Sequence, residues 1–113
     1  MALSHELPIY KDVYKLILEI FDVTKDFSRE YKYTLGQDMK RDVIMLVRSI
    51  YRANRHAEKK QYLEEFLDNF EILKLEIRLS TDLKLITIRK QATISLLLES
   101  IGRQATGWKN KSV

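Results

Sequence analysis

Apolar residues recur along most of this chain at spacings of three and four, which is the period of an amphipathic α-helix. The pattern predicts four helices, at about residues 8–24, 35–55, 57–83 and 87–109. Only three Gly and one Pro occur among the 113 residues, so the turn residues that punctuate a many-stranded β fold are missing. We therefore expect residues 1–113 to form one all-α domain, an antiparallel up-and-down four-helix bundle.

The first predicted helix is apolar over more than half of its circumference. A surface helix in a monomer needs a narrower apolar stripe than that. Either this helix is central in the bundle, or another subunit covers the surplus. For so short a chain the second explanation is favoured slightly.

Residues 37–55, which make up most of the second predicted helix, have two faces of different character. One arc is apolar and consists of Met39, Val43, Leu46, Val47, Ile50 and Tyr51. Four arginines fall within an arc of about 60° on the other side, and we call them the arginine row: Arg41, Arg48, Arg52 and Arg55. The planar guanidinium fork suits phosphate, so the row predicts polyanion binding. The alternative is a solvated charged face that serves solubility only.

Two further groups of side chains permit two interpretations each. Phe27, Tyr31 and Tyr33 follow the first helix. They would stack on nucleic-acid bases if exposed, although packing onto the end of the bundle is favoured. The third helix carries an acidic row, Glu64, Asp68 and Glu71, which either meets a basic helix of a neighbouring subunit or is simply solvated, the second being favoured.

Composition narrows the function classes. The net charge of +4 and the pI near 9.3 favour an anionic partner weakly. No Cys is present, and His5 and His56 lack a second His at metal-ligand spacing, so we expect no disulfide, metal site or other cofactor. No Gly-rich phosphate loop or nucleophile motif occurs, so we expect no enzyme. With neither a signal sequence nor a long uncharged apolar run, we expect a soluble, cytoplasmic protein without membrane contact.

Four stretches of the chain resemble one known family. They are YKYTLGQDM (31–39), IYRANRHAEKKQYL (50–63), LKLEIRLSTDLKLI (73–86) and ESIGRQATGWKNK (99–111). In this order they are similar to the accessory variability determinant (Avd) proteins of diversity-generating retroelements. Those proteins belong to a wider group of four-helix bundles that includes products of intervening sequences in 23S ribosomal RNA genes.

The resemblance implies a positively charged, non-enzymatic bundle that assembles as a homopentameric ring. It also implies that the bundle binds RNA and DNA without reading sequence, and docks on the retroelement reverse transcriptase during mutagenic retrohoming. Lys74 and Arg78 occupy the positions of a basic pair that contacts polymerase or nucleic acid, and Arg52, Arg55 and Arg103 lie in the RANR and IGR words. The other implication of the resemblance is a structural or adaptor bundle from a ribosomal RNA intervening sequence, which binds protein or RNA.

Residue pattern and resemblance together give one set of predicted contact residues: Arg41, Arg48, Arg52, Arg55, Lys74, Arg78 and Arg103. The chain departs from the family pattern at Ser28, where Pro is common, and at three positions where apolar residues are common, namely Gln104, Ala105 and Lys109. These departures affect the loop and the final helical turn, whereas the predicted fold is unchanged.

Overall fold

The structure, a computed structural model, describes residues 3–112, and this part of the chain is helical without strands. Its four long helices are α1 (Pro8–Thr24), α3 (Leu35–Arg55), α4 (Lys60–Asp82) and α5 (Ile88–Lys111). A 3-10 turn, Ser4–Glu6, precedes α1, and a single helical turn, α2 (Arg29–Lys32), lies between α1 and α3. The prediction of an all-α bundle is confirmed. The turn α2 lies in a segment expected to have no helical structure.

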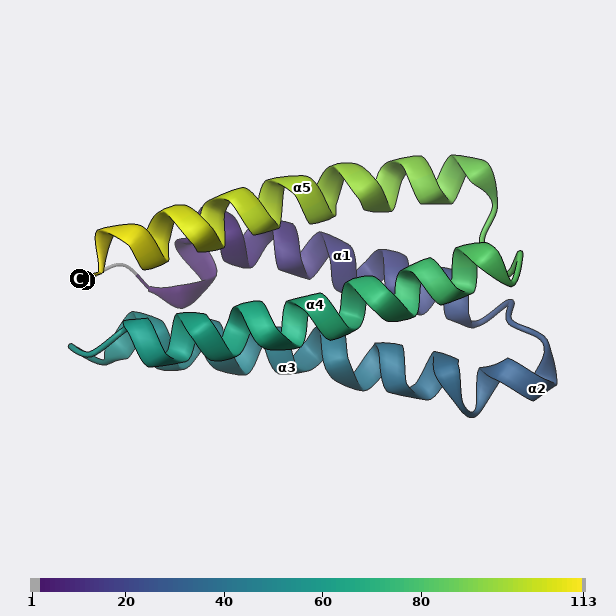
Figure 1. The fold of residues 1–113 in the computed structure, drawn as a ribbon, viewed down its shortest axis with the longest axis horizontal. Helices are drawn as coiled ribbons and strands as arrows, with labels where there is room; N and C mark the ends of the chain where they lie inside the picture. Colours follow the sequence, from purple (N-terminus) through teal and green to yellow (C-terminus); the bar gives the residue numbers. More distant parts are fainter. Residues whose placement is uncertain (1–2, 113) are drawn as a thin grey trace.

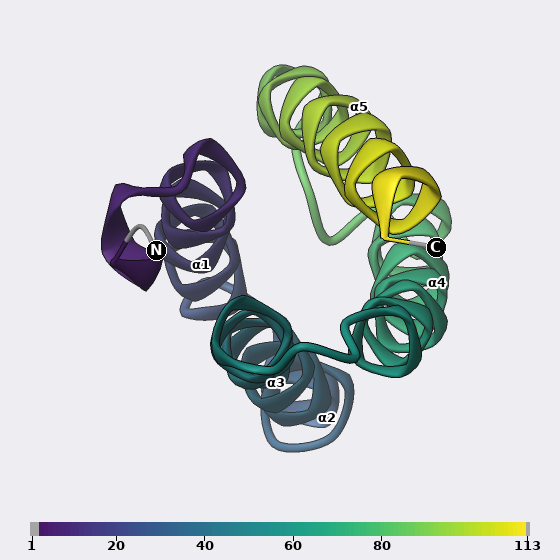
Figure 2. The same cartoon turned by 90° about the vertical axis from the view of Figure 1, so that its left-hand side faces the viewer.

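The four long helices run alternately up and down (Figure 1). Seen along the bundle they occupy four corners in the order α1, α3, α4 and α5, with α5 closing back onto α1 (Figure 2). Each helix therefore has two neighbours and one side facing outward. No helix is central, so α1 cannot bury its wide apolar surface within this bundle.

The core lies where the apolar stripes of the four helices meet. Its fully buried larger side chains are Val13, Leu16, Ile20, Met39, Val43, Leu46, Ile50, Leu63, Phe66, Leu73, Ile94 and Ile101. The predicted apolar arc of α3 is confirmed at four positions, but Tyr51 is 43% exposed and Val47 only half-buried. The small Ser49 is buried on the α3 surface instead. Tyr51 was assigned to the core wrongly, since its ring lies at the edge of the arc and packs outward against Tyr10, with 6.1 Å between ring centroids.

The connection between α3 and α4 is closed by one lysine. Lys59 Nζ donates hydrogen bonds to the backbone carbonyls of Ala53, Asn54 and His56, at 2.7, 3.2 and 2.9 Å. These carbonyls lie at the C-terminal end of α3, where helical carbonyls have no partner within the helix. The ammonium also complements the helix dipole. Because Lys59 is used in this way, α4 begins at Lys60 and not at residue 57 as predicted.

A tight turn separates α4 from α5. Lys84 adopts a left-handed conformation with φ of 61°. The amide of Lys84 donates to the Thr81 carbonyl at 3.0 Å, and the amide of Leu85 donates to the Ser80 carbonyl at 2.8 Å. This pair of bonds is the Schellman motif, in which glycine is the usual left-handed residue. Thr87 caps the start of α5, and its side chain accepts a hydrogen bond from the Lys90 amide at 3.2 Å.

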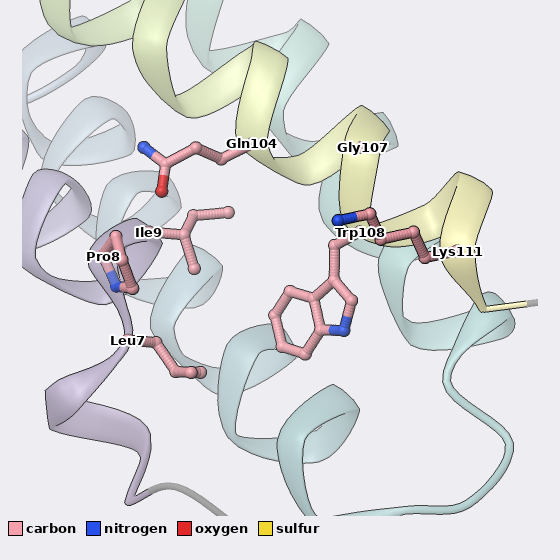
Figure 3. A pocket seen from close by; sticks show the side chains of 7 residues that line it. All are labelled: Leu7, Pro8, Ile9, Gln104, Gly107, Trp108 and Lys111. Atoms are coloured by element: carbon pink, nitrogen blue, oxygen red, sulfur yellow. The ribbon is translucent and has the colours of Figure 1, made fainter.

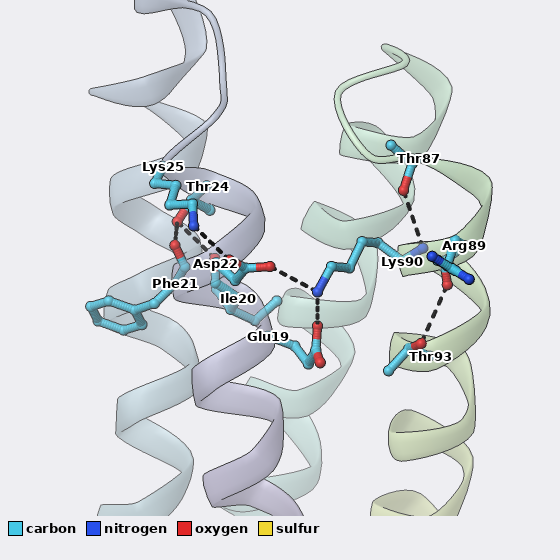
Figure 4. Close-up of polar contacts among 10 residues, drawn as sticks. All are labelled: Glu19, Ile20, Phe21, Asp22, Thr24, Lys25, Thr87, Arg89, Lys90 and Thr93. Atoms are coloured by element: carbon cyan, nitrogen blue, oxygen red, sulfur yellow. Dashed lines mark hydrogen bonds and ion pairs between the residues drawn. The ribbon is translucent and has the colours of Figure 1, made fainter.

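Polar contacts fix α5 against α1. Lys90 Nζ reaches across to Glu19 at 2.9 Å and Asp22 at 2.7 Å (Figure 4). Lys25 and then Lys90 hold the pKa of the Asp22 carboxyl down at about 2, because both ammonium groups favour its ionised form. Two turns further along, Asp12 accepts hydrogen bonds from Ser100 Oγ and Gln104 Nε2, both at 2.8 Å. These pairs set the register of the two helices.

The aromatic residues after α1 behave differently from one another. Phe27 is buried in the core, and Tyr31 is half-buried against it. Packing onto the bundle end is therefore confirmed for these two rings. Tyr33 is exposed.

Candidate nucleic-acid interface

The arginine row lies on the outer side of α3. Arg41, Arg48 and Arg55 are exposed, and Arg52 is half-buried because its side chain turns toward α4. Spacings of seven, four and three residues keep the four side chains on one side of a helix of 3.6 residues per turn. The predicted gathering of guanidinium groups is therefore present in the geometry.

Carboxylates compensate part of this charge. Arg41 lies 3.3 Å from an Asp38 oxygen and 3.4 Å from an Asp42 oxygen, both on its own helix. Arg52 lies 3.7 Å from Glu65 on α4. Among the described residues neither Arg48 nor Arg55 has an ion-pair partner, so these two are the free cations of the row.

The compensated arginines are held only weakly. Exposed ion pairs contribute about 0–1 kcal/mol each, since water screens them and the side chains lose rotamer freedom. A phosphate competes well for such a guanidinium because it accepts two parallel hydrogen bonds. The row thus keeps its capacity for anions, with Arg48 and Arg55 offering the most favourable contacts.

Lys74 and Arg78 line a different surface, a groove of about 350 Å³ between α4 and α5. Lys74 Nζ lies 3.0 Å from Glu71 and 5.4 Å from the centre of the Phe70 ring. Arg78 is more exposed and lies 3.9 Å from Asp82. The groove offers two cations at its wall, each near one carboxylate.

Arg103 stands apart from both surfaces. It lies on α5, diagonally across the bundle from α3 (Figure 2), and pairs with Glu99 at 3.5 Å. The seven predicted contact residues therefore form three separate places: the arginine row on α3, the α4–α5 groove, and Arg103. One bundle does not bring them together.

Two outer faces carry apolar side chains that nothing in the described part of the chain covers. The α1–α3 face comprises Tyr14, Leu18, Phe21, Ile44 and Tyr51. The α4 face comprises Ile72, Leu75, Leu79 and Leu83. The first face was signalled by the wide apolar arc of α1. The second face, whose residues also follow spacings of three and four, was not predicted from the sequence. The core stripe of α4 has the same period and dominates the apolar pattern of the helix.

An apolar cleft of about 420 Å³ lies between the start of α1 and the end of α5 (Figure 3). Leu7, Pro8 and Ile9 form one wall, and Trp108 of α5 faces them. A second cleft of about 400 Å³ lies further along the same two helices, beside Leu18 and Leu96. Neither cleft gathers acid, base or nucleophile side chains in the manner of an active site.

Within residues 3–112, His, Asp and Glu side chains do not converge in a group of three or more that would hold a metal ion. None of the helices in this range combines the length and apolarity needed to cross a lipid bilayer.

Comparison with known proteins identifies a family for this chain. No similar protein was found among curated proteins. A family model described as bAvd-like matches residues 7–112, which is nearly the whole chain and includes all four long helices. The resemblance carried by the four sequence stretches is thereby confirmed, and the chain belongs to the bAvd-like family.

Proposed function

We propose that this chain is a non-enzymatic accessory protein of a diversity-generating retroelement. In this role it binds nucleic acid and the retroelement reverse transcriptase, and so supports mutagenic retrohoming. Membership of the bAvd-like family supports the accessory role. The net charge of +4 is consistent with a polyanionic partner.

One observation carries the nucleic-acid part of the proposal: Arg48 and Arg55 are exposed on one side of α3 without carboxylate partners in the described chain. They are seven residues apart, so about 10 Å of helix axis separates them. That separation suits successive contacts along a phosphate backbone better than a single bound phosphate. Such contacts position the strand and read no bases.

The structure determines which substitution tests this. Reversing Arg48 and Arg52 together would place a carboxylate beside Glu65, so a loss of binding would be mixed with a loss of stability. The double variant Arg48→Gln/Arg55→Gln avoids this, since neither residue has an ion pair to lose within residues 3–112. Its control is Arg29→Gln/Arg89→Gln, which removes two exposed arginines outside the row.

The assay is fluorescence anisotropy of a labelled single-stranded RNA and DNA over a range of salt concentrations. If both arginines neutralise phosphates, the slope of log K against log salt becomes shallower by about 1.4 in the row variant and is unchanged in the control. Equal slopes in the wild type and the row variant would show that the row takes no part in binding. No salt-dependent binding by the wild type would refute the nucleic-acid function altogether.

The α4–α5 groove is the proposed contact with the reverse transcriptase. Its two cations and its apolar floor, formed by Ile77 and Leu98, fit a protein partner with acidic and apolar side chains. Lys74→Ala/Arg78→Ala should weaken co-purification with the polymerase while leaving nucleic-acid binding by the row intact. If this variant instead loses nucleic-acid binding and still co-purifies with the polymerase, the groove is the nucleic-acid contact and the arginine row is the polymerase contact.

Self-assembly as a homopentamer is part of the proposal. The two uncovered apolar faces group five and four large exposed apolar side chains, and such groups mark sites of protein–protein contact. Contacts between Arg52 and Glu65, and between Met39 and Ser80, show how α3 and α4 lie side by side. The acidic end of α4 is therefore level with Arg48 and Tyr51, and its aliphatic end is level with Phe21 and Ile44.

Parallel copies placed around a ring would bring acidic against basic and aliphatic against aliphatic side chains. Different faces meeting in this way form a heterologous contact, which closes into a ring when the rotation between neighbouring copies divides a full turn. Sedimentation equilibrium measures the subunit number, and Leu18→Glu should dissociate the assembly. A wild-type monomer would overturn this part of the proposal.

The second candidate is a structural or adaptor bundle whose partner is protein. The compensated charges of Arg41 and Arg52 and the uncovered apolar faces favour it. The salt-dependence assay separates the two functions, because an adaptor for protein would show no nucleic-acid binding whose affinity falls with rising salt concentration.

A further inference from the structure

Glu76 is a buried carboxyl group at the interface between α3 and α4. It is only 9% exposed, and its Oε1 atom has no hydrogen-bond partner. On its own helix it is flanked by buried Leu73, Ile77 and Ser80. A buried carboxyl that lacks a donor is costly in its ionised form, because water no longer solvates the charge.

The titratable and charged groups that face Glu76 come from α3: Asp42, Asp38 and Arg41. The negative charges of Asp42 and Asp38 disfavour the ionised form of Glu76. The positive charge of Arg41 opposes them only in part, because Arg41 is paired with both aspartates, at 3.4 Å and 3.3 Å.

The hydroxyl group of Ser80, one turn along α4, does not supply a donor to this carboxyl. Ser80 Oγ instead contacts the backbone carbonyl of Glu76 at 2.9 Å and Met39 Sδ at 3.2 Å. The buried Glu76 carboxyl is therefore most stable when it carries its own proton.

We propose that Glu76 keeps a proton in the folded bundle, which makes the interface between α3 and α4 a pH-sensitive contact that weakens in alkaline solution. The device concerns the bundle alone and requires no ligand. It therefore stands or falls independently of the proposed nucleic-acid function.

The charge environment agrees with the geometry. Burial is the largest cause that raises the pKa of Glu76, followed by the hydrogen bond and the negative charge of Asp42, and together they bring it to about 8. The ordinary value is 4.5. The folded state therefore binds more protons than the unfolded state between these two values. The stability that this proton provides is complete below pH 4.5 and is lost as pH rises through about 8.

The test compares urea unfolding of the wild type, Glu76→Gln and Glu71→Gln from about pH 5 to about pH 10. Relative to Glu76→Gln, the unfolding constant of the wild type should rise by up to about tenfold per pH unit below pH 8, because one proton is released on unfolding. Glu71 is exposed on the same helix, so Glu71→Gln should keep the wild-type pH profile. Parallel profiles for the wild type and Glu76→Gln would overturn the proposal.

A second measurement needs no variant and protects the test against misfolding of Glu76→Gln. Carbon-13 NMR of side-chain carboxyls in the wild type should show one glutamate titrating near pH 8, well above the others. If all glutamates in the folded protein titrate near their ordinary pKa, Glu76 does not keep a proton in the folded bundle and the proposal is refuted.

Discussion

The cap formed by Lys59 permits a quantitative prediction. Lys59→Met keeps the length of the side chain and removes the ammonium, and with it three hydrogen bonds to carbonyls at the end of α3. Hydrogen bonds from charged groups contribute about 1.5–3 kcal/mol each when well formed. Water replaces part of them here, because Lys59 is only half-buried and the carbonyls are accessible at a helix end.

We therefore expect a net loss of about 2 kcal/mol, which includes the lost interaction with the helix dipole. For a domain of this size such a loss lowers Tm by roughly 8 °C. Differential scanning calorimetry measures it, with Lys60→Met as the control, since Lys60 is the exposed neighbour at the start of α4. If the two variants melt within a degree of each other, Lys59 does not stabilise the end of α3.

Further predictions concern the backbone of α5 and of the turn before it. Gly107→Ala should raise stability by about 0.5–1 kcal/mol, because a Cβ there meets open space and alanine favours helix. Gly102→Ala should raise stability less than Gly107→Ala, or lower it, since the new Cβ would lie 3.3 Å from Phe70 Cε2. Thermal melts of the two variants compare their stabilities directly. Lys84→Gly should stabilise by about 1 kcal/mol by removing a left-handed non-glycine residue, and a lower Tm would contradict the strain assigned to it.

The sequence predicted the helices well because each long helix carries a strong apolar period. Helix ends were predicted less well where a side chain of the connecting segment decides them. Lys59 sets the start of α4 by folding back onto α3, and no local pattern distinguishes it from its neighbour Lys60. The spacing of the arginine row was predicted because it depends only on helical geometry.

Charge compensation between helices was beyond prediction, since it depends on which helices become neighbours. Glu65 meets Arg52 only because α4 packs beside α3. Glu76 was missed for the same reason: on a helical wheel it lies at the border of the apolar stripe, and only the packing of α4 in the bundle shows that it is buried, with acidic side chains of α3 nearby.

The bundle has an even number of long helices, joined by short connections. Both ends of the described chain therefore lie at the same end of the bundle. Ser4 Oγ accepts a hydrogen bond from Asn54 at 3.0 Å, and Lys111 and Ser112 lie beside Ala57 and Lys59 (Figure 2). A fluorescent protein or affinity tag fused at either terminus would therefore emerge next to Arg55 and crowd that part of α3. Labels intended to leave it accessible belong at the opposite end, near Tyr33 or in the turn at Lys84.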